Sequence, residues 1–129
     1  MIRNSFPLLL GAFFAVFFSS TTHAQIAVFK ALDKVTGKTF LLEIPVKSSA
    51  TLGPLNVHVQ SCFSTPPEEP PETKVFLEVE ETINSQQRRL FSGWMFASSP
   101  GLNGLEHPVY DLWSISCKME SGELFTGNE

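Results

Sequence analysis

The sequence predicts a small all-β domain, an antiparallel β-sandwich or barrel of about six strands, that is closed by one disulfide. Three observations support this fold class. Apolar and polar residues alternate through most of the chain after residue 24, which is the period of strands rather than of helices. Turn-forming residues separate the alternating runs. Both cysteines lie in this region, which is typical of a small domain in an oxidising compartment.

The first 24 residues are set apart from this pattern. Arg3 precedes an uncharged apolar run of 13 residues, 6–18. A membrane-spanning helix needs about 20 apolar residues, so the run suits the hydrophobic region of a secretory signal peptide. Small residues at Thr22 and Ala24 occupy the positions that signal peptidase reads. We expect a signal peptide at 1–24, cleaved after Ala24.

Cleavage leaves 105 of the 129 residues, the size of one domain. We expect a single β domain at 25–119 and a flexible tail at 120–129, with no transmembrane span remaining. Loss of Arg3 changes the net charge from −4 to −5. Nucleic acid and anionic membranes are poor partners for this chain, because both bind clustered basic residues and Arg88-Arg89 is the only basic pair.

The expected strands follow one another in short runs. The first two, 26–33 and 38–46, are joined by a loop in which Gly37 can adopt a positive φ. The next run, 55–62, places Cys62 on its polar side, so burial of this sulfur requires a bulge near Ser61. Three further runs complete the prediction, at 74–82, 88–97 and 109–118.

A disulfide between Cys62 and Cys117 is the simplest use of the two cysteines. It would close a loop of about 55 residues and stabilise the fold by about 4 kcal/mol in the chain-entropy model. The alternative is a reactive or metal-bound thiolate, but there is no Cys-x-x-Cys and two isolated cysteines do not form a zinc site. The sequence therefore predicts no metal, and it contains no cofactor-binding motif.

The most unusual segment is 65–73, with four prolines and three carboxylates. Proline fixes φ and lacks an amide donor, so we expect an extended polyproline II arm outside the sheets. One hypothesis makes it a docking arm for a basic or aromatic-lined partner; the other makes it a stiff connector that protects a sheet edge. The candidate binding residues in the arm are Pro66, Pro67, Glu68, Glu69, Pro70, Pro71 and Glu72.

An aromatic cluster at 91–96 has two possible roles. If both of its faces are covered, it belongs to the core. If Trp94 is exposed beside Tyr110, the pair offers a flat stacking surface for a sugar or a peptide. Trp113 shares the parity of Ile115 and Cys117, so we expect it in the core against the disulfide.

Glu106, His107 and Asp111 bring two carboxyls and an imidazole within six residues. Such groups can perform general acid–base catalysis in a pocket, and metal binding would need a further placed ligand. A hydrogen-bonded structural histidine is the simpler interpretation. No nucleophile elbow, zinc-protease motif, phosphate loop or dinucleotide fingerprint accompanies the group.

Four blocks of sequence, at 31–38, 66–73, 91–100 and 105–113, together resemble one family. It is the exported alphaproteobacterial family of domain of unknown function 2155. The resemblance covers nearly the whole mature chain and implies a protein of the Gram-negative envelope with a periplasmic address. It implies no activity and no catalytic residues.

From these observations we expect a non-catalytic periplasmic domain that binds an envelope protein or glycan. The arm, with the surface from Trp94 to Tyr110, is the expected contact. The alternatives are a small hydrolase or glycan-processing enzyme that uses His107 with Glu106 or Asp111, and a carbohydrate-binding module that needs Trp94 or Tyr110 on a flat face.

Overall fold

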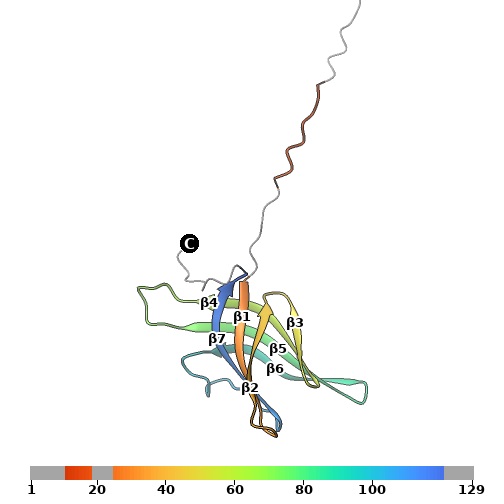
Figure 1. The fold of residues 1–129 in the computed structure, drawn as a ribbon, viewed down its shortest axis with the longest axis vertical. Coiled ribbons are helices and arrows are strands. Elements are labelled where there is room, and N and C mark those ends of the chain that lie inside the picture. The colour runs from red at the N-terminus through yellow and green to blue at the C-terminus, as the bar shows by residue number, and fades with distance from the viewer. Residues whose placement is uncertain (1–10, 19–24, 121–129) are drawn as a thin grey trace, which may run out of the picture.

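The computed structural model describes residues 11–18 and 25–120 of the chain (Figure 1). The expected cleavage site after Ala24 and the expected tail beyond Glu120 lie outside these described residues. Residues 11–18 are exposed and belong to no helix or strand. Within the described ranges, no helix is long and apolar enough to cross a membrane.

The described residues of the domain fold into seven strands, which confirms the predicted all-β class. Six of these strands agree with the predicted runs to within two residues at each end. In chain order they are β1 (Gln25–Asp33), β2 (Thr39–Pro45), β3 (Ser49–Leu52), β4 (Leu55–Ser64), β5 (Thr73–Ile83), β6 (Gln86–Phe96) and β7 (Tyr110–Met119).

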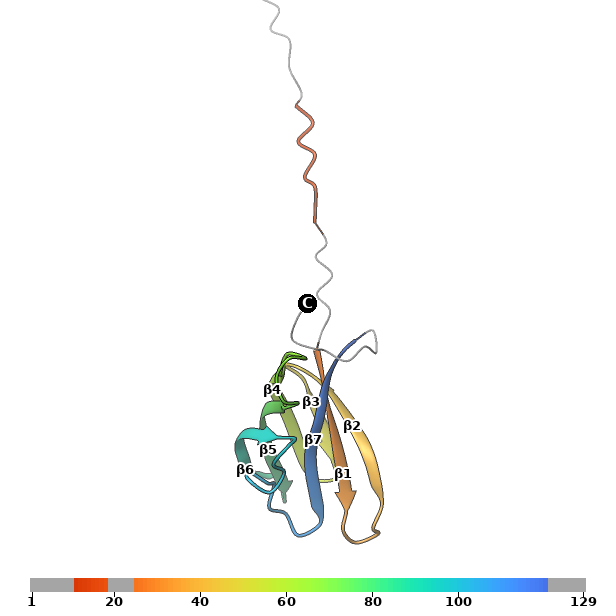
Figure 2. The same ribbon diagram turned by 90° about the vertical axis from the view of Figure 1, so that its left-hand side faces the viewer.

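The strands form two antiparallel sheets, so the fold is a sandwich (Figures 1 and 2). One sheet has three strands in the order β2-β1-β7, and the other has four in the order β3-β4-β5-β6. In Figure 1 the strands of the two sheets run in different directions, so the two layers cross rather than align. The segments after β4 and β6 lie at one end of the four-stranded sheet, and the β5–β6 turn lies at the other.

The core lies between the sheets and follows the alternation of the sequence. On β5 the side chains of Val75, Leu77 and Val79 are fully buried, and they belong to one cluster with Phe29 and Ile44 of the other sheet. Burial of each such side chain contributes about 1.5–3 kcal/mol. This shared cluster is what holds the two sheets together.

The strand β3 is the one that the sequence did not predict. It has four residues, follows a turn in which Lys47 has a φ of 70°, and pairs with β4 from the edge of its sheet. Leu52 is its only buried residue. A strand that buries so little carries almost no apolar alternation to detect.

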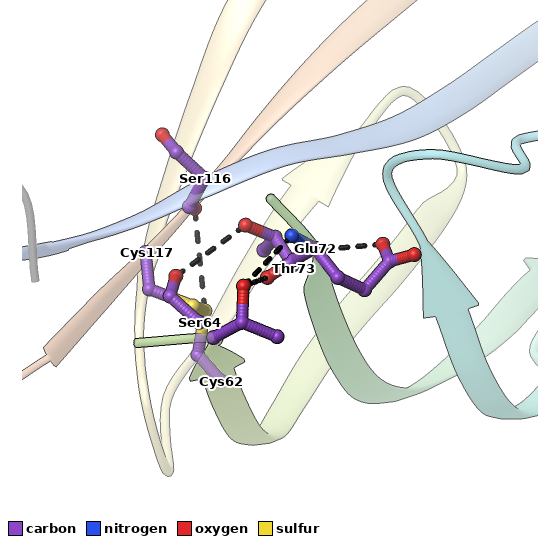
Figure 3. Close-up of a disulfide and its surroundings, with 7 residues drawn as sticks. Cys62, Ser64, Glu72, Thr73, Ser116 and Cys117 are labelled. Carbon is purple, nitrogen blue, oxygen red and sulfur yellow. Dashed lines mark hydrogen bonds between the residues drawn. A yellow bond between two sulfur atoms is a disulfide. The ribbon is translucent and has the colours of Figure 1, made fainter. Parts of the chain in front are cut away.

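The disulfide forms as expected and joins the two sheets (Figure 3). The register between β4 and β5 shifts between Val59 and Ser61, which confirms the predicted bulge and turns Cys62 inward to 3% exposure. Cys62 of β4 is bonded to Cys117 of β7, with their Cα atoms 5.9 Å apart. A covalent link across the sandwich therefore lies next to the start of the loop between β4 and β5.

The expectation for Trp113 is wrong. Its side chain is half-buried and lies outside the core cluster. The register between β1 and β7 shifts at this point and leaves Ile115 unpaired, so the parity of β7 reverses before Cys117. Cys117 faces the core, whereas Trp113 and Ile115 face the outside of the three-stranded sheet.

Candidate functional site

The Pro/Glu arm is the connection between β4 and β5, residues 65–72 (Figure 1). Thr65 closes its base: its N–H donates to the carbonyl oxygen of Glu72 at 3.0 Å, and its hydroxyl accepts from the N–H of Glu72 at 3.0 Å. The same hydroxyl donates to the carbonyl oxygen of Pro70 at 3.0 Å. The arm therefore leaves the sheet and returns to it at one fastened point.

Within the arm the chain turns rather than running extended throughout, so that part of the expectation is wrong. The N–H of Glu69 donates to the carbonyl oxygen of Pro66 at 3.1 Å, which makes a β-turn with Pro67 and Glu68 at its centre. Proline favours this position because its φ is already fixed. The exposed residues of the arm are Pro67, Glu68, Glu69, Pro70 and Pro71.

Glu72 attaches the end of the arm to the segment that follows β6. One carboxylate oxygen accepts from the N–H of Thr73 at 3.0 Å and from the N–H of Ser98 at 3.2 Å, and the other accepts from the Ser98 hydroxyl. The Ser98 hydroxyl bond is the main reason why the pKa of Glu72 lies below its ordinary value. Figure 3 shows Glu72 next to Thr73, with its carboxylate pointing away from the disulfide. This carboxylate therefore positions the end of the arm.

Trp94 lies on the outer face of the four-stranded sheet, not in the core. It pairs with Phe76 of β5, and the two rings meet edge to face with centroids 5.3 Å apart. The Lys74 ammonium lies 5.6 Å from the Trp94 ring centroid and 5.3 Å from that of Phe63, which is 59% exposed. We call these four residues the outer aromatic patch. The patch lies on the part of the sheet from which the arm extends.

His107 is buried at a different place, against Glu81 of β5. Its Nε2 lies 2.5 Å from a carboxylate oxygen of Glu81, and both side chains are 6% exposed. Its Nδ1 accepts from the N–H groups of Val109 at 3.1 Å and Tyr110 at 3.2 Å. Nε2 therefore carries the hydrogen and donates a hydrogen bond to the Glu81 carboxylate. Both ring nitrogens are engaged in holding the loop before β7 against β5.

Glu81 was not among the predicted site residues, although the sequence contained a signal for it. It shares the parity of Val75, Leu77 and Val79, and a carboxylate at that parity faces the core and needs a partner there. Its other oxygen lies 3.4 Å from Nη2 of Arg88, across the β5–β6 hairpin.

Asp111 and Glu106 do not join His107 in a catalytic group. Asp111 forms an ion pair with Lys34, 3.0 Å apart, and Lys34 also donates to the carbonyl oxygen of His107 at 2.8 Å. Glu106 is exposed. Lys34, Glu106 and Asp111 border an open hollow. The ion pair between Lys34 and Asp111 fastens the loop before β7.

The structure also separates Tyr110 from Trp94. Tyr110 packs against the core and against Gly53, whose φ is 56°. Its ring lies 5.6 Å from that of His107. Tyr110 of β7 thus lies on the core side of the four-stranded sheet and Trp94 on its outer face. The predicted residues that the structure brings together are His107 and Tyr110, whose rings are in contact, with Glu106 and Asp111 at the hollow that His107 borders.

Comparison with known proteins places the chain in a family. A family model described as "Uncharacterized protein conserved in bacteria (DUF2155)" matches residues 27–117. An uncharacterized protein of Rickettsia prowazekii (strain Madrid E) is 24% identical over 88 residues, which cover 67% of this chain and 57% of that relative. The chain thus spans little more than half of that curated relative's length. No solved structure matches.

The family match and the structure agree on the extent of the domain. The matched residues include part or all of each of the strands β1 to β7, and both disulfide cysteines lie within them. The four sequence blocks that resemble the family also lie within these residues. This chain belongs to the bacterial family of domain of unknown function 2155.

Proposed function

We propose that this chain is an exported, non-catalytic binding protein of the bacterial cell envelope, whose mature domain docks a protein partner through its Pro/Glu arm. One observation carries the proposal: the arm presents exposed prolines and carboxylates from a hydrogen-bonded base. The support comes from three sources, namely the address that the sequence implies, the rigidity of the arm and its chemistry.

The periplasmic address is supported by the N-terminal sequence and by the cysteines. The apolar run at 6–18 and the small residues before Gln25 have the pattern of a cleaved signal peptide. Cys62 and Cys117 are bonded to each other, and such bonds persist in oxidising compartments such as the periplasm. Export also fits the envelope family that the sequence resembles.

The arm is suited to binding because little of its conformational freedom remains to be lost. Its prolines fix φ at four positions, Thr65 fastens both of its ends, and Glu72 attaches it to Ser98. Ordering a flexible loop on binding costs about 0.5–1.5 kcal/mol per immobilised side chain, and a loop that is already ordered avoids most of this cost.

The chemistry of the arm indicates the kind of groove that it fits. Exposed proline rings are recognised by aromatic side chains, and the carboxylates of Glu68 and Glu69 are complementary to Arg or Lys. We therefore propose a protein partner whose groove is lined by aromatic residues and edged by basic ones.

The hydrolase alternative draws no support from the site. A general acid or base needs a ring nitrogen within reach of a substrate. In His107 Nδ1 is engaged by two backbone N–H groups and Nε2 by Glu81. Of the carboxylates proposed to work with it, Asp111 is paired with Lys34 and Glu106 is exposed.

The test is photo-crosslinking in living cells that express the full chain. A photoreactive residue replaces Glu69 in the arm, and a matched probe replaces Val35, which is 77% exposed in the β1–β2 turn. The proposal predicts a discrete adduct with one envelope protein from the Glu69 probe only. No adduct from Glu69, or the same adduct from both positions, would contradict it.

A further inference from the structure

A polar groove crosses the outer face of the four-stranded sheet, beside the outer aromatic patch. It has a volume of about 330 Å³, within the range of about 300–1,000 Å³ that is typical of small-molecule sites. Every side chain that lines it is polar, and together they come from β3, β4 and β5: Ser49, Asn56, His58, Gln60, Glu78 and Glu80.

His58 and Gln60 are each held by one hydrogen bond, and each retains a polar group that can bond a ligand. His58 Nδ1 is hydrogen-bonded to the Ser49 hydroxyl at 2.8 Å, which orients the ring and leaves Nε2 for a ligand. The side-chain oxygen of Gln60 accepts from Lys47 at 3.3 Å, so its NH₂ group remains as a donor. The groove therefore offers both donors and acceptors on planar side chains.

The aromatic patch and the groove are continuous along β5. Phe76 and Glu78 are two residues apart and point to the same face, about 7 Å from each other along the strand. The partners of this pair on β6 are Trp94 and Ser92. A ligand that lies across β5 can thus stack on an aromatic ring and hydrogen-bond in the groove at the same time.

The charges on this face compensate one another. Arg89 Nη2 lies 3.6 Å from a carboxylate oxygen of Glu78 and 3.6 Å from one of Glu80. Two further positive charges border the face: that of Lys74, over the aromatic rings, and that of Lys47, which bonds Gln60. A face with two acids and three bases is close to balanced in charge, so it gives little electrostatic preference for a strongly charged ligand such as a nucleic acid or a basic peptide.

We propose that this face is a binding site for a neutral oligosaccharide. The apolar face of one sugar ring would stack on Trp94 in place of the exposed Lys74 side chain, and the hydroxyls of the next sugar would bond Glu78, Asn56 and His58. Sugar hydroxyls both donate and accept, which matches the mixed groups of the groove. This site is separate from the arm and does not depend on the arm's proposed partner.

The two tryptophans of the chain make the test specific. Trp94 lies on the proposed site and Trp113 on the outside of the other sheet, and the chain contains no other tryptophan. The mature domain with Trp113→Phe reports on Trp94 alone, and the domain with Trp94→Phe reports on Trp113 alone. Both are titrated with chitotetraose, cellotetraose and maltotetraose while tryptophan emission is recorded.

The proposal predicts that at least one of these sugars changes the emission of Trp94 with a Kd of about 1 mM or tighter, and leaves the emission of Trp113 unchanged. Absence of any change for Trp94 with all three sugars would overturn it. Equal changes for both tryptophans would also overturn it, because they would indicate nonspecific binding.

Calorimetry then locates the binding with variants. Trp94→Ala and the double change Asn56→Ala/Glu78→Gln should each weaken sugar binding about tenfold or more, whereas the matched control Trp113→Ala should not. The double change keeps the test decisive if Trp94→Ala fails to fold. Unaltered affinity in the double variant would refute the site. Replacement of the arm by a Gly/Ser loop of equal length should leave sugar binding intact, so failure of the arm's function is distinguishable from failure of this site.

Discussion

Removal of the disulfide tests the account of how this sandwich is held together. The double substitution Cys62→Ala/Cys117→Ala opens the link between β4 and β7, two strands that belong to different sheets. The cysteines are 55 residues apart, and closing such a loop in the unfolded chain is worth about 4 kcal/mol in the chain-entropy model. Domains of this size have unfolding free energies of about 5–15 kcal/mol, so the loss is a large share of the total.

The assay is urea unfolding of the mature domain, followed by tryptophan emission, with thermal unfolding as a second measure. We expect the free energy of unfolding to fall by about 4 kcal/mol and the melting temperature by about 15–30 °C. Reduction of the unmodified protein should give a similar loss. A variant that unfolds within about 1 kcal/mol of the unmodified protein would show that the link between the sheets contributes little, and would refute this reasoning.

Three further changes have defined outcomes. Glu72→Gln should lower the free energy of unfolding at neutral pH, and urea titrations over a pH series should show this loss disappearing in acid. The bond from Ser98 lowers the pKa of Glu72 from 4.5 in the folded state. The carboxylate's contribution to stability is therefore complete above about pH 4.5 and is lost as the pH falls through the lower folded-state pKa. Gly53→Ala should cost about 2–4 kcal/mol in urea unfolding, because φ is 56° and the added Cβ would lie 2.7 Å from Cζ of Tyr110; a variant as stable as the parent would contradict this contact. Ser85→Gly should raise the melting temperature, because Ser85 has a φ of 64° in the β5–β6 turn and glycine removes a strain of about 1 kcal/mol; an unchanged value would argue against that strain.

The strands β4 and β5 were the most predictable, because along each of them every second side chain is buried over most of its length. The limits of parity appear at the bulges. For Cys62 the conflict between a polar parity and an expected disulfide indicated a bulge, and the structure has one. For Trp113 no such conflict existed, because Trp113, Ile115 and Cys117 were all apolar and could all be assigned to the core. A bulge between apolar residues reverses the face to which they point, but the pattern of apolar and polar residues in the sequence does not change.

The candidate site was predictable in composition but not in its supporting contacts. The density of proline and glutamate identified the arm, whereas the expected pairing of Trp94 with Tyr110 is wrong. The residues that fasten the arm could not be found this way, because Ser98 is 26 positions from Glu72 and reaches it only in the folded sheet. Glu81 and His107 are also 26 positions apart. The sequence suggested Glu106 or Asp111 as the partner of His107, because they are its neighbours in the chain.

The most direct test of the central claim is calorimetric titration of the mature domain with the envelope protein that is crosslinked from Glu69. The charge-reversed arm, Glu68→Lys/Glu69→Lys, is compared with a control that reverses two exposed acids elsewhere, Glu106→Lys/Glu120→Lys. Docking through the arm predicts that the arm variant binds at least about tenfold more weakly while the control binds as the unmodified domain does. Equal affinity of the arm variant and the unmodified domain would contradict the claim.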